Sequence, residues 1–438
     1  MARILTERIS RALIVEEPHA TLDEMLRRGG IEAHRIAAAK SERALIDAIH
    51  RVDAQVLFKR SRVPVTRSVL EACPSLFAVQ LCCIGDDSVD KEACADHGVM
   101  VFNDPVSNGR SVVELVVGHL IALSRRLFET DQQMHSNRWN KSSLGRYEVL
   151  GKRVGIVGLG NIGRQVARVC EHLGMEIVFH DTRLVAQEVG SEFGWTYEED
   201  LATLFRTTDI VTIHTSARDA RGRDNSGMLD EMLGQLGADR DEASPRIFLN
   251  LARGTLYTPE ALLDAVKSGR VRRAAVDVYP HEPAPGDEQW INPYRDEPRV
   301  VCTPHIGAAT QEAQPRIARR VAAGVLSFAS RGSVRDCVFA PRVRLNLSSH
   351  PDAAAALAVV HSVSRGTKKA VDDAIYRAGV SNLGSVHHDF SVGCAYDLSM
   401  LDRPLSAAEL DELVKHAREI SGDENAIRTI RQVSLSED

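Results

Sequence analysis

Arg253, Glu282 and His305 each follow an apolar run of the sequence, and their side chains form a set that can move a proton beside a bound carboxylate. Arginine binds a carboxylate through two parallel hydrogen bonds, and histidine takes up or releases a proton near neutral pH. A neighbouring glutamate holds the imidazole in one tautomer. We therefore predict that Arg253 holds a substrate, that His305 is the acid or base, and that Glu282 orients it.

Each of these residues alone also fits a structural role. Glu282 can brace a loop, His305 can act as a cap, and Arg253 can form a surface ion pair. The apolar runs before them are typical of parallel strands, whose carboxyl ends share the edge of the sheet where ligands bind. Because all three residues occupy such ends, the sequence favours the catalytic interpretation.

A glycine-rich stretch supplies the setting for this chemistry. Gly158, Gly160 and Gly163 follow a short apolar run and open an amphipathic helix, and Asp181 follows the next apolar run. Such glycines allow a tight turn, the approach of a pyrophosphate to the backbone, and close packing of helix on strand. A bare pattern of this kind also occurs in turns without a ligand, but here the strand, helix and acid are all present. We predict a dinucleotide site.

The acid also predicts which dinucleotide binds. Asp181 is placed to bond the ribose hydroxyls and to repel a 2′-phosphate, which favours NAD over NADP, although Arg183 weakens this preference. Beside a nicotinamide, the three strand-end residues suit the oxidation of a 2-hydroxy acid. His305 takes the hydroxyl proton while hydride leaves the carbon for the nicotinamide.

The rest of the chain alternates apolar runs with helix patterns, which predicts an α/β fold with parallel sheets. Arg60, Ser61 and Arg62 follow one strand end and are candidates for binding an anionic substrate, with a solvated basic loop as the alternative. Asn108 and Gly109 open a long apolar helix. They can contact a phosphate or carboxylate, and a purely capping role fits them equally well.

Composition limits the possible functions. The 438 residues exceed a single core, so two or three domains are expected, and the net charge of −6 disfavours nucleic acid as a partner. The charged N-terminal start and the lack of a long apolar run predict a cytoplasmic protein without a membrane partner. Eight cysteines without a C-x-x-C pair predict reduced thiols, and we expect no metal site.

Several blocks resemble a known family. ARG at 252–254, DVYPHEP at 277–283 and TPHIGAATQEA at 303–313 are similar to the signature blocks of the D-isomer-specific 2-hydroxyacid dehydrogenases. Within this family, residues 82–90 (CCIGDDSVD) and 101–118 (VFNDPVSNGRSVVELVVG) resemble the phosphoglycerate dehydrogenase branch. NRWNK at 137–141 does so too, and the similarity spans about residues 10–340.

The resemblance implies oxidation of 3-phospho-D-glycerate with NAD, the first step of L-serine synthesis, by a homodimer or homotetramer. It implies catalytic roles for Arg253, Glu282 and His305, and binding of the phosphorylated substrate by Arg60, Ser61, Asn108 and Gly109. Reduction of 2-oxoglutarate, glyoxylate or hydroxypyruvate, or a non-catalytic NAD-sensing corepressor-like scaffold, are the alternatives. The implied NAD contacts, beyond the glycines, are Asn161, Ile162, Asp181, Thr215, Leu251, Ala252, Arg253, Asp277, His305, Ile306, Gly307 and Ala308.

The resemblance also implies the domain order. A Rossmann-type NAD domain (108–305) is inserted in a flavodoxin-like substrate domain (1–107 and 306–337), with the dimer contact on the NAD domain. After a linker (338–355), residues 356–438 follow the pattern βαββαβ, in which Ser406 and Glu409 form a capping box. This part is similar to the regulatory ACT domain.

Overall fold

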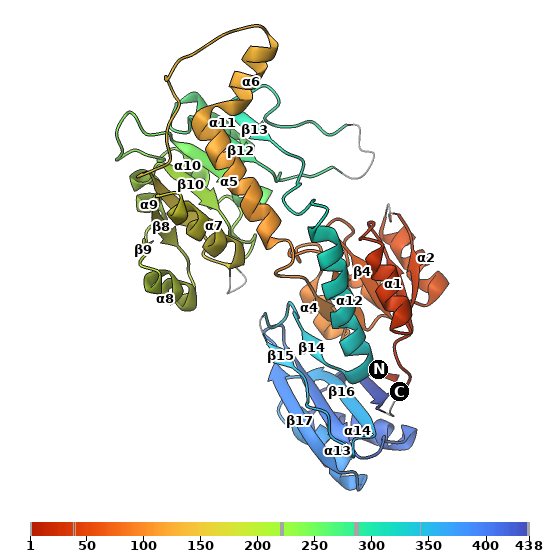
Figure 1. The fold of residues 1–438 in the computed structure, drawn as a ribbon. Coiled ribbons are helices and arrows are strands. Elements are labelled where there is room, and N and C mark those ends of the chain that lie inside the picture. The colour runs from red at the N-terminus through yellow and green to blue at the C-terminus, as the bar shows by residue number, and fades with distance from the viewer. Residues whose placement is uncertain are drawn as a thin grey trace. The chain divides into compact units, whose positions relative to one another are not determined.

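The structure is a computed structural model that describes residues 2–37, 39, 41–219, 223–283, 289–341 and 343–435. The chain forms two compact units, which are Met1–Ser107 with Gln314–Asp438 and Asn108–Ala313 (Figure 1). The inserted unit therefore extends past residue 305, where the sequence placed its end. No helix among the described residues is long and apolar enough to span a membrane.

The first unit contains a parallel five-stranded sheet in the order β3-β2-β4-β5-β6. This is the flavodoxin-like order, as predicted. Strands β2, β4, β5 and β6 are largely buried, as expected where helices cover both faces, whereas the edge strand β3 is polar and partly exposed. Ser41 and Asp90 cap two of the helices by accepting from backbone N–H groups. The elements are β2 (Arg11–Ile14), α1 (Thr21–Arg28), β3 (Glu32–Arg35), α2 (Glu42–Val52), β4 (Val56–Lys59), α3 (Arg67–Ala72), β5 (Ala78–Leu81), α4 (Lys91–Asp96) and β6 (Met100–Phe102).

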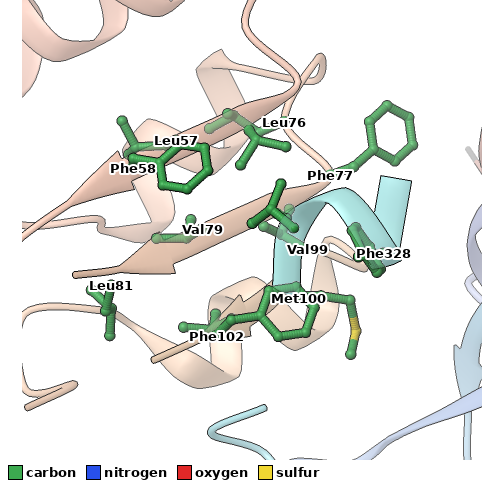
Figure 2. Packing of buried hydrophobic residues seen from close by; sticks show 14 of the residues in the cluster. Leu57, Phe58, Leu76, Phe77, Val79, Leu81, Val99, Met100, Phe102 and Phe328 are labelled. Carbon is green, nitrogen blue, oxygen red and sulfur yellow. The ribbon is translucent and has the colours of Figure 1, made fainter. Parts of the chain in front are cut away.

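Helix α12 (Ala313–Arg331) returns the chain to this sheet, as the sequence predicted for residues 311–328. Figure 2 shows Phe328 of α12 among side chains of β5 and β6. The Phe102 and Phe328 rings meet edge to face, with centroids 5.1 Å apart. The core of this unit is thus completed by a segment more than two hundred residues further along the chain.

The second unit has a parallel sheet in the order β13-β12-β11-β10-β7-β8-β9, a Rossmann order extended by one strand. The α/β fold class is therefore confirmed. Its strands are β7 (Arg153–Val157), β8 (Glu176–His180), β9 (Thr196–Tyr197), β10 (Ile210–Ile213), β11 (Ile247–Asn250), β12 (Arg273–Val276) and β13 (Val300–Cys302). Its helices are α5 (Gly109–Arg125), α6 (Leu127–His135), α7 (Asn161–His172), α8 (Leu184–Glu192), α9 (Leu201–Thr207), α10 (Asp230–Leu233), the 3₁₀ turn η1 (Gly254–Leu256) and α11 (Pro259–Lys267).

The polar insert at residues 238–245 is only partly the exposed loop that its composition predicts. Its first six residues are exposed except Arg240, whose side chain is 30% exposed, but Ser244 is buried and donates to Asp209 at 2.8 Å. Arg240 pairs with the same carboxylate at 3.0 Å. The insert therefore closes over the start of β10.

The C-terminal part follows the predicted βαββαβ order, with β16 (Ala355–Ser362), α13 (Thr367–Arg377), β17 (Asn382–Asp389), β18 (Cys394–Leu401), α14 (Ala407–Ser421) and β19 (Ile427–Ser434). The predicted capping box of Ser406 and Glu409 opens α14. Strand β1 (Arg3–Leu5), which the sequence analysis missed, extends this sheet by pairing with β19 in parallel.

This part shares its core with the parallel sheet of the same unit. Tyr396 and Leu398 of the C-terminal sheet belong to the same apolar cluster as β4, β5 and α12. The Arg431 guanidinium lies 3.7 Å from the centroid of the Phe328 ring and donates to the Phe328 carbonyl at 2.6 Å. In the predicted linker, Phe339 is buried and β15 (Arg344–Leu345) pairs with β14 (Val334–Arg335), so the first part of this segment packs on the unit, whereas residues 348–352 are exposed.

Candidate active site

The three predicted catalytic residues follow three neighbouring parallel strands. Arg253 follows β11, Glu282 lies beyond β12, and His305 follows β13, and these strands are adjacent in the sheet. Their carboxyl ends share one edge, which is where α/β sheets bind ligands. The glycine turn after β7 lies at the same edge of this sheet.

His305 and Glu282 contact each other directly. His305 Nδ1 lies 2.8 Å from both Glu282 carboxylate oxygens. Because a carboxylate only accepts hydrogen bonds, Nδ1 carries a hydrogen and Nε2 is the nitrogen that can exchange a proton with a substrate. The side chains are 44% and 31% exposed respectively, so a small molecule can reach the pair.

Asp277 fixes the loop that carries His305. One carboxylate oxygen accepts from the Ile306 N–H at 2.9 Å and from the Thr303 hydroxyl at 2.6 Å, and the other accepts from the Gly307 N–H at 2.9 Å. His305 itself has φ of 54°, a conformation that non-glycine residues adopt at a cost. The buried carboxylate thus holds the loop in a strained shape. The predicted NAD contact of Asp277 stays a prediction.

Asn250 fixes the loop that carries Arg253, and the sequence analysis did not find it. Its amide nitrogen donates to the Arg253 carbonyl at 2.9 Å, and its amide oxygen accepts from the Ala252 N–H at 3.0 Å. A Cβ atom on Gly254 would lie 2.0 Å from the Tyr279 carbonyl carbon, so glycine is required there. The signal that could have identified it is an asparagine at the end of an apolar run of the sequence.

The glycine turn fits a dinucleotide. Gly158 has φ of 94°, and a Cβ atom on Gly163 would lie 2.1 Å from the Gly158 carbonyl oxygen. Around Gly160, at the N-terminus of α7, the nearest atom to such a Cβ is 3.9 Å away. The turn is therefore closely packed at Gly163 and open around Gly160, as the approach of a pyrophosphate to the backbone requires.

Asp181 lies at the end of β8 and is buried. It accepts from the Leu159 N–H at 2.8 Å, and the Arg183 guanidinium donates to both of its oxygens, at 2.9 and 2.7 Å. Burial acts to raise the pKa of the Asp181 carboxyl, but the hydrogen bonds from Arg183 outweigh it and hold this pKa below its usual value. Asp181 is therefore an anion at neutral pH.

Asn108 occupies the N-cap position of α5 but does not cap the helix with its side chain, so a purely capping role is wrong. Its Oδ1 is buried and accepts no hydrogen bond within the described part of the chain. An unpaired buried oxygen costs about 1–3 kcal/mol, which a donor on a ligand would offset. A Cβ atom on Gly109 would lie 3.1 Å from the Asn161 amide nitrogen, so a larger residue there would crowd the Asn161 side chain.

In the first unit, Glu16 shapes the predicted anion-binding loop after β4. Its carboxylate accepts from the backbone N–H groups of Arg60, Arg62 and Val63 at 2.5, 2.8 and 2.7 Å. The sequence analysis missed Glu16, although it directly follows a strand-end run. With its backbone held in this way, Arg60 presents its side chain from a defined loop.

Lys59 supports the same loop from beneath. It is fully buried, and its Nζ donates to the Arg60 carbonyl at 2.7 Å and to the Ser88 hydroxyl at 2.6 Å. Burial lowers the pKa of the Lys59 ammonium, an effect that the nearby Glu16 opposes. Ser61 and Arg62 are exposed on the outer side of the loop.

Comparison with known proteins agrees with this geometry. Residues 117–307 match the D-isomer specific 2-hydroxyacid dehydrogenase, NAD binding domain. The chain is 35% identical over 351 residues to D-3-phosphoglycerate dehydrogenase of Escherichia coli, covering 79% of this chain and 82% of the relative. It is 30% identical over 402 residues to D-3-phosphoglycerate dehydrogenase 2 of Saccharomyces cerevisiae, covering 89% and 82%.

Solved structures show the same architecture. A protein from Thermus thermophilus aligns with a TM-score of 0.61 at 26% identity, covering 72% of this chain and 96% of that one. A glyoxylate reductase from Paecilomyes thermophila aligns with a TM-score of 0.64 at 22% identity, covering 75% and 98%, which shows the fold alone. From the sheet order, the strand-end residues and these similarities, we conclude that the chain belongs to the family of D-isomer-specific 2-hydroxyacid dehydrogenases.

Proposed function

We propose that the chain oxidises 3-phospho-D-glycerate to 3-phosphohydroxypyruvate with NAD, the first step of L-serine synthesis. The observation that carries the proposal is the contact of His305 Nδ1 with both Glu282 oxygens at 2.8 Å, at the sheet edge that also carries Arg253. The substrate class follows the relatives, which are phosphoglycerate dehydrogenases. Initial rates with phosphorylated and unphosphorylated 2-hydroxy acids test it.

In this proposal each residue has one task. Arg253 binds the substrate carboxylate, which orients the hydroxyl-bearing carbon. His305 accepts the hydroxyl proton on Nε2, and Glu282 stabilises the imidazolium that forms. NAD, when bound at the glycine turn, accepts the hydride. In the reverse direction His305 returns the proton to the carbonyl oxygen.

Two alternatives predict other rate patterns. A reductase of 2-oxoglutarate, glyoxylate or hydroxypyruvate would act as well on substrates without a phosphate. A non-catalytic NAD-sensing scaffold would bind NAD without turnover. The ordered His305–Glu282 pair and the anion-binding loop held by Glu16 favour an enzyme that acts on a phosphorylated acid.

Replacing Arg60 by alanine should impair use of the phosphorylated substrate selectively. A charge-assisted hydrogen bond contributes about 1.5–3 kcal/mol, so kcat/KM for 3-phosphoglycerate should fall about 10- to 150-fold. Activity on D-glycerate should change little. Arg28→Ala is the matched control, because Arg28 is an exposed arginine of the same unit that pairs with Glu24. Equal losses on both substrates would remove Arg60 from the phosphate site.

NAD should be used better than NADP by about 10- to 100-fold in kcat/KM, because an ionised Asp181 carboxylate beside the ribose would repel a 2′-phosphate. Arg183, which already neutralises part of this charge, keeps the preference moderate. Asp181→Asn keeps the shape of the side chain and removes its charge, so the ratio of kcat/KM with NAD to kcat/KM with NADP should become smaller. Steady-state rates with both cofactors measure this, and equal use by the unaltered protein contradicts it.

The assembly and the roles of the parts belong to the same proposal. Residues 1–107 and 314–337 bind substrate, 108–313 bind NAD, and 356–438 form an ACT-like regulatory domain. Beyond α6, Trp139 and Leu144 are 80% and 79% exposed, and such apolar side chains support a homodimer or homotetramer built on this segment.

All eight cysteines are free thiols, which supports a cytoplasmic location.

A further inference from the structure

His361, His387 and Asp397 form a cluster in the C-terminal sheet that the proposed reaction does not use. They lie on β16, β17 and β18, which are neighbouring antiparallel strands. His361 Nε2 is 2.8 Å from one oxygen of Asp397, and His387 Nδ1 is 3.0 Å from the other. These ligand atoms all lie within 4.8 Å of one another.

The outer nitrogen of each ring is also held. His361 Nδ1 contacts the Ser362 carbonyl oxygen at 2.6 Å, and His387 Nε2 contacts an oxygen of Asp389 at 3.0 Å. A histidine that binds a metal characteristically donates its other N–H to a carbonyl or a carboxylate, which fixes the tautomer. Both rings therefore have the orientation of metal ligands, with Nε2 of one and Nδ1 of the other turned toward the same point.

The carboxylate of Asp397 contacts both rings, 2.8 Å from His361 Nε2 and 3.0 Å from His387 Nδ1. The rings are stacked with centroids 5.6 Å apart, and Lys368 Nζ of α13 lies 3.4 Å from Asp397. A divalent cation bound by both inner nitrogens and one Asp397 oxygen would join the two rings.

We propose that His361, His387 and Asp397 bind a divalent transition-metal ion, with Zn²⁺ as the best fit. Two imidazole nitrogens and one carboxylate oxygen are three of its four usual ligands, and water completes the set from the side of His387, which is 31% exposed. Ligands about 2 Å from zinc lie about 3.3 Å apart, within the spread found here. Lys368 stays paired with Asp372, at 2.6 Å.

This proposal corrects the sequence-based expectation of no metal site. The three ligands are separated by 25 and 9 intervening residues and show no short metal-binding spacing. Only the strand register brings them together, since His387 pairs directly with Asp397. The ion would join β17, at the edge of the sheet, to the buried β16 and β18. It would therefore stabilise the C-terminal part of the chain.

The test uses the full-length protein, stripped with EDTA and titrated with Zn²⁺ by calorimetry. We expect one ion per chain, and Co²⁺ in its place should give a visible spectrum typical of four-coordinate nitrogen and oxygen ligation. His387→Gln should weaken Zn²⁺ binding at least 10-fold. Because His387 lies on an edge strand and its side chain is 31% exposed, this variant should fold, which circular dichroism checks.

His388→Gln is the matched control, because His388 is the next residue of β17 and its ring packs on Phe390. This variant should bind Zn²⁺ like the unaltered protein. The proposal is overturned if the unaltered protein binds no stoichiometric Zn²⁺. It is equally overturned if His387→Gln binds as tightly as His388→Gln, or if the Co²⁺ spectrum shows thiolate ligation, because the ion would then be held at a cysteine.

Discussion

Replacing His305 by alanine should lower kcat by about 100- to 10,000-fold, the usual contribution of general acid–base catalysis. The alanine has no group to accept the hydroxyl proton, and Glu282 loses the imidazole ring that it contacts at 2.8 Å. KM for NAD should change little, since the glycine turn is untouched. Steady-state kinetics with the phosphorylated substrate measures both quantities.

Glu282→Gln is the companion variant for this prediction. The amide keeps the size of the side chain but loses the negative charge that stabilises the imidazolium, so its kcat should fall less than that of His305→Ala. The pH profile separates this role from a structural one, because the pH at which half of the activity is lost should move in Glu282→Gln. A His305→Ala protein with a nearly normal kcat would refute the catalytic assignment.

Arg253→Ala should damage both substrate binding and turnover. Loss of the charge partner of the bound carboxylate costs about 2–5 kcal/mol, which corresponds to about 30- to 5,000-fold in kcat/KM. Unlike Arg60→Ala, this change should affect phosphorylated and unphosphorylated substrates alike, because both carry the carboxylate. NAD affinity, measured by quenching of protein fluorescence, should remain within a few-fold of normal.

Arg253→Lys tests the geometry of this contact. Lysine keeps the charge but cannot form two parallel hydrogen bonds, so it should recover only part of the lost activity. The contact of Asn250 with the Arg253 carbonyl and the packing of Gly254 on Tyr279 do not involve the Arg253 side chain and should persist. The lysine replaces the guanidinium that donates to the Ala252 carbonyl at 2.9 Å. Full activity in Arg253→Lys would show that charge alone suffices.

Much of the fold could be predicted because apolar periodicity reports burial directly. The strands that precede Arg253 and His305 are fully apolar runs, and helix α11 lies where Pro259 and the capping Thr258 place it. By contrast, α8 begins with the exposed Leu184 and Val185, so its pattern showed no clear apolar face. The helices and strands that the sequence did not predict are those in which exposed and buried positions do not follow a helical or strand period.

The residues of the candidate site also fall into those that could be predicted from the sequence and those that could not. Arg253, Glu282 and His305 were found because strand ends and residue types are visible in the sequence. Asn250 and Glu16 were missed because their partners are backbone N–H and carbonyl groups of folded loops, which leave no trace in residue type. Such contacts depend on the path of the chain in three dimensions.

The pairing of β1 with β19 has a consequence for biosynthesis. Arg3 and its partner Thr429 are 426 positions apart in the sequence. During synthesis β1 therefore stays unpaired and open to neighbouring polypeptides until β19 has been made. Closing a contact over so long a stretch of chain is also entropically costly. A nascent chain interrupted before residue 427 would thus expose a strand that has no partner of its own.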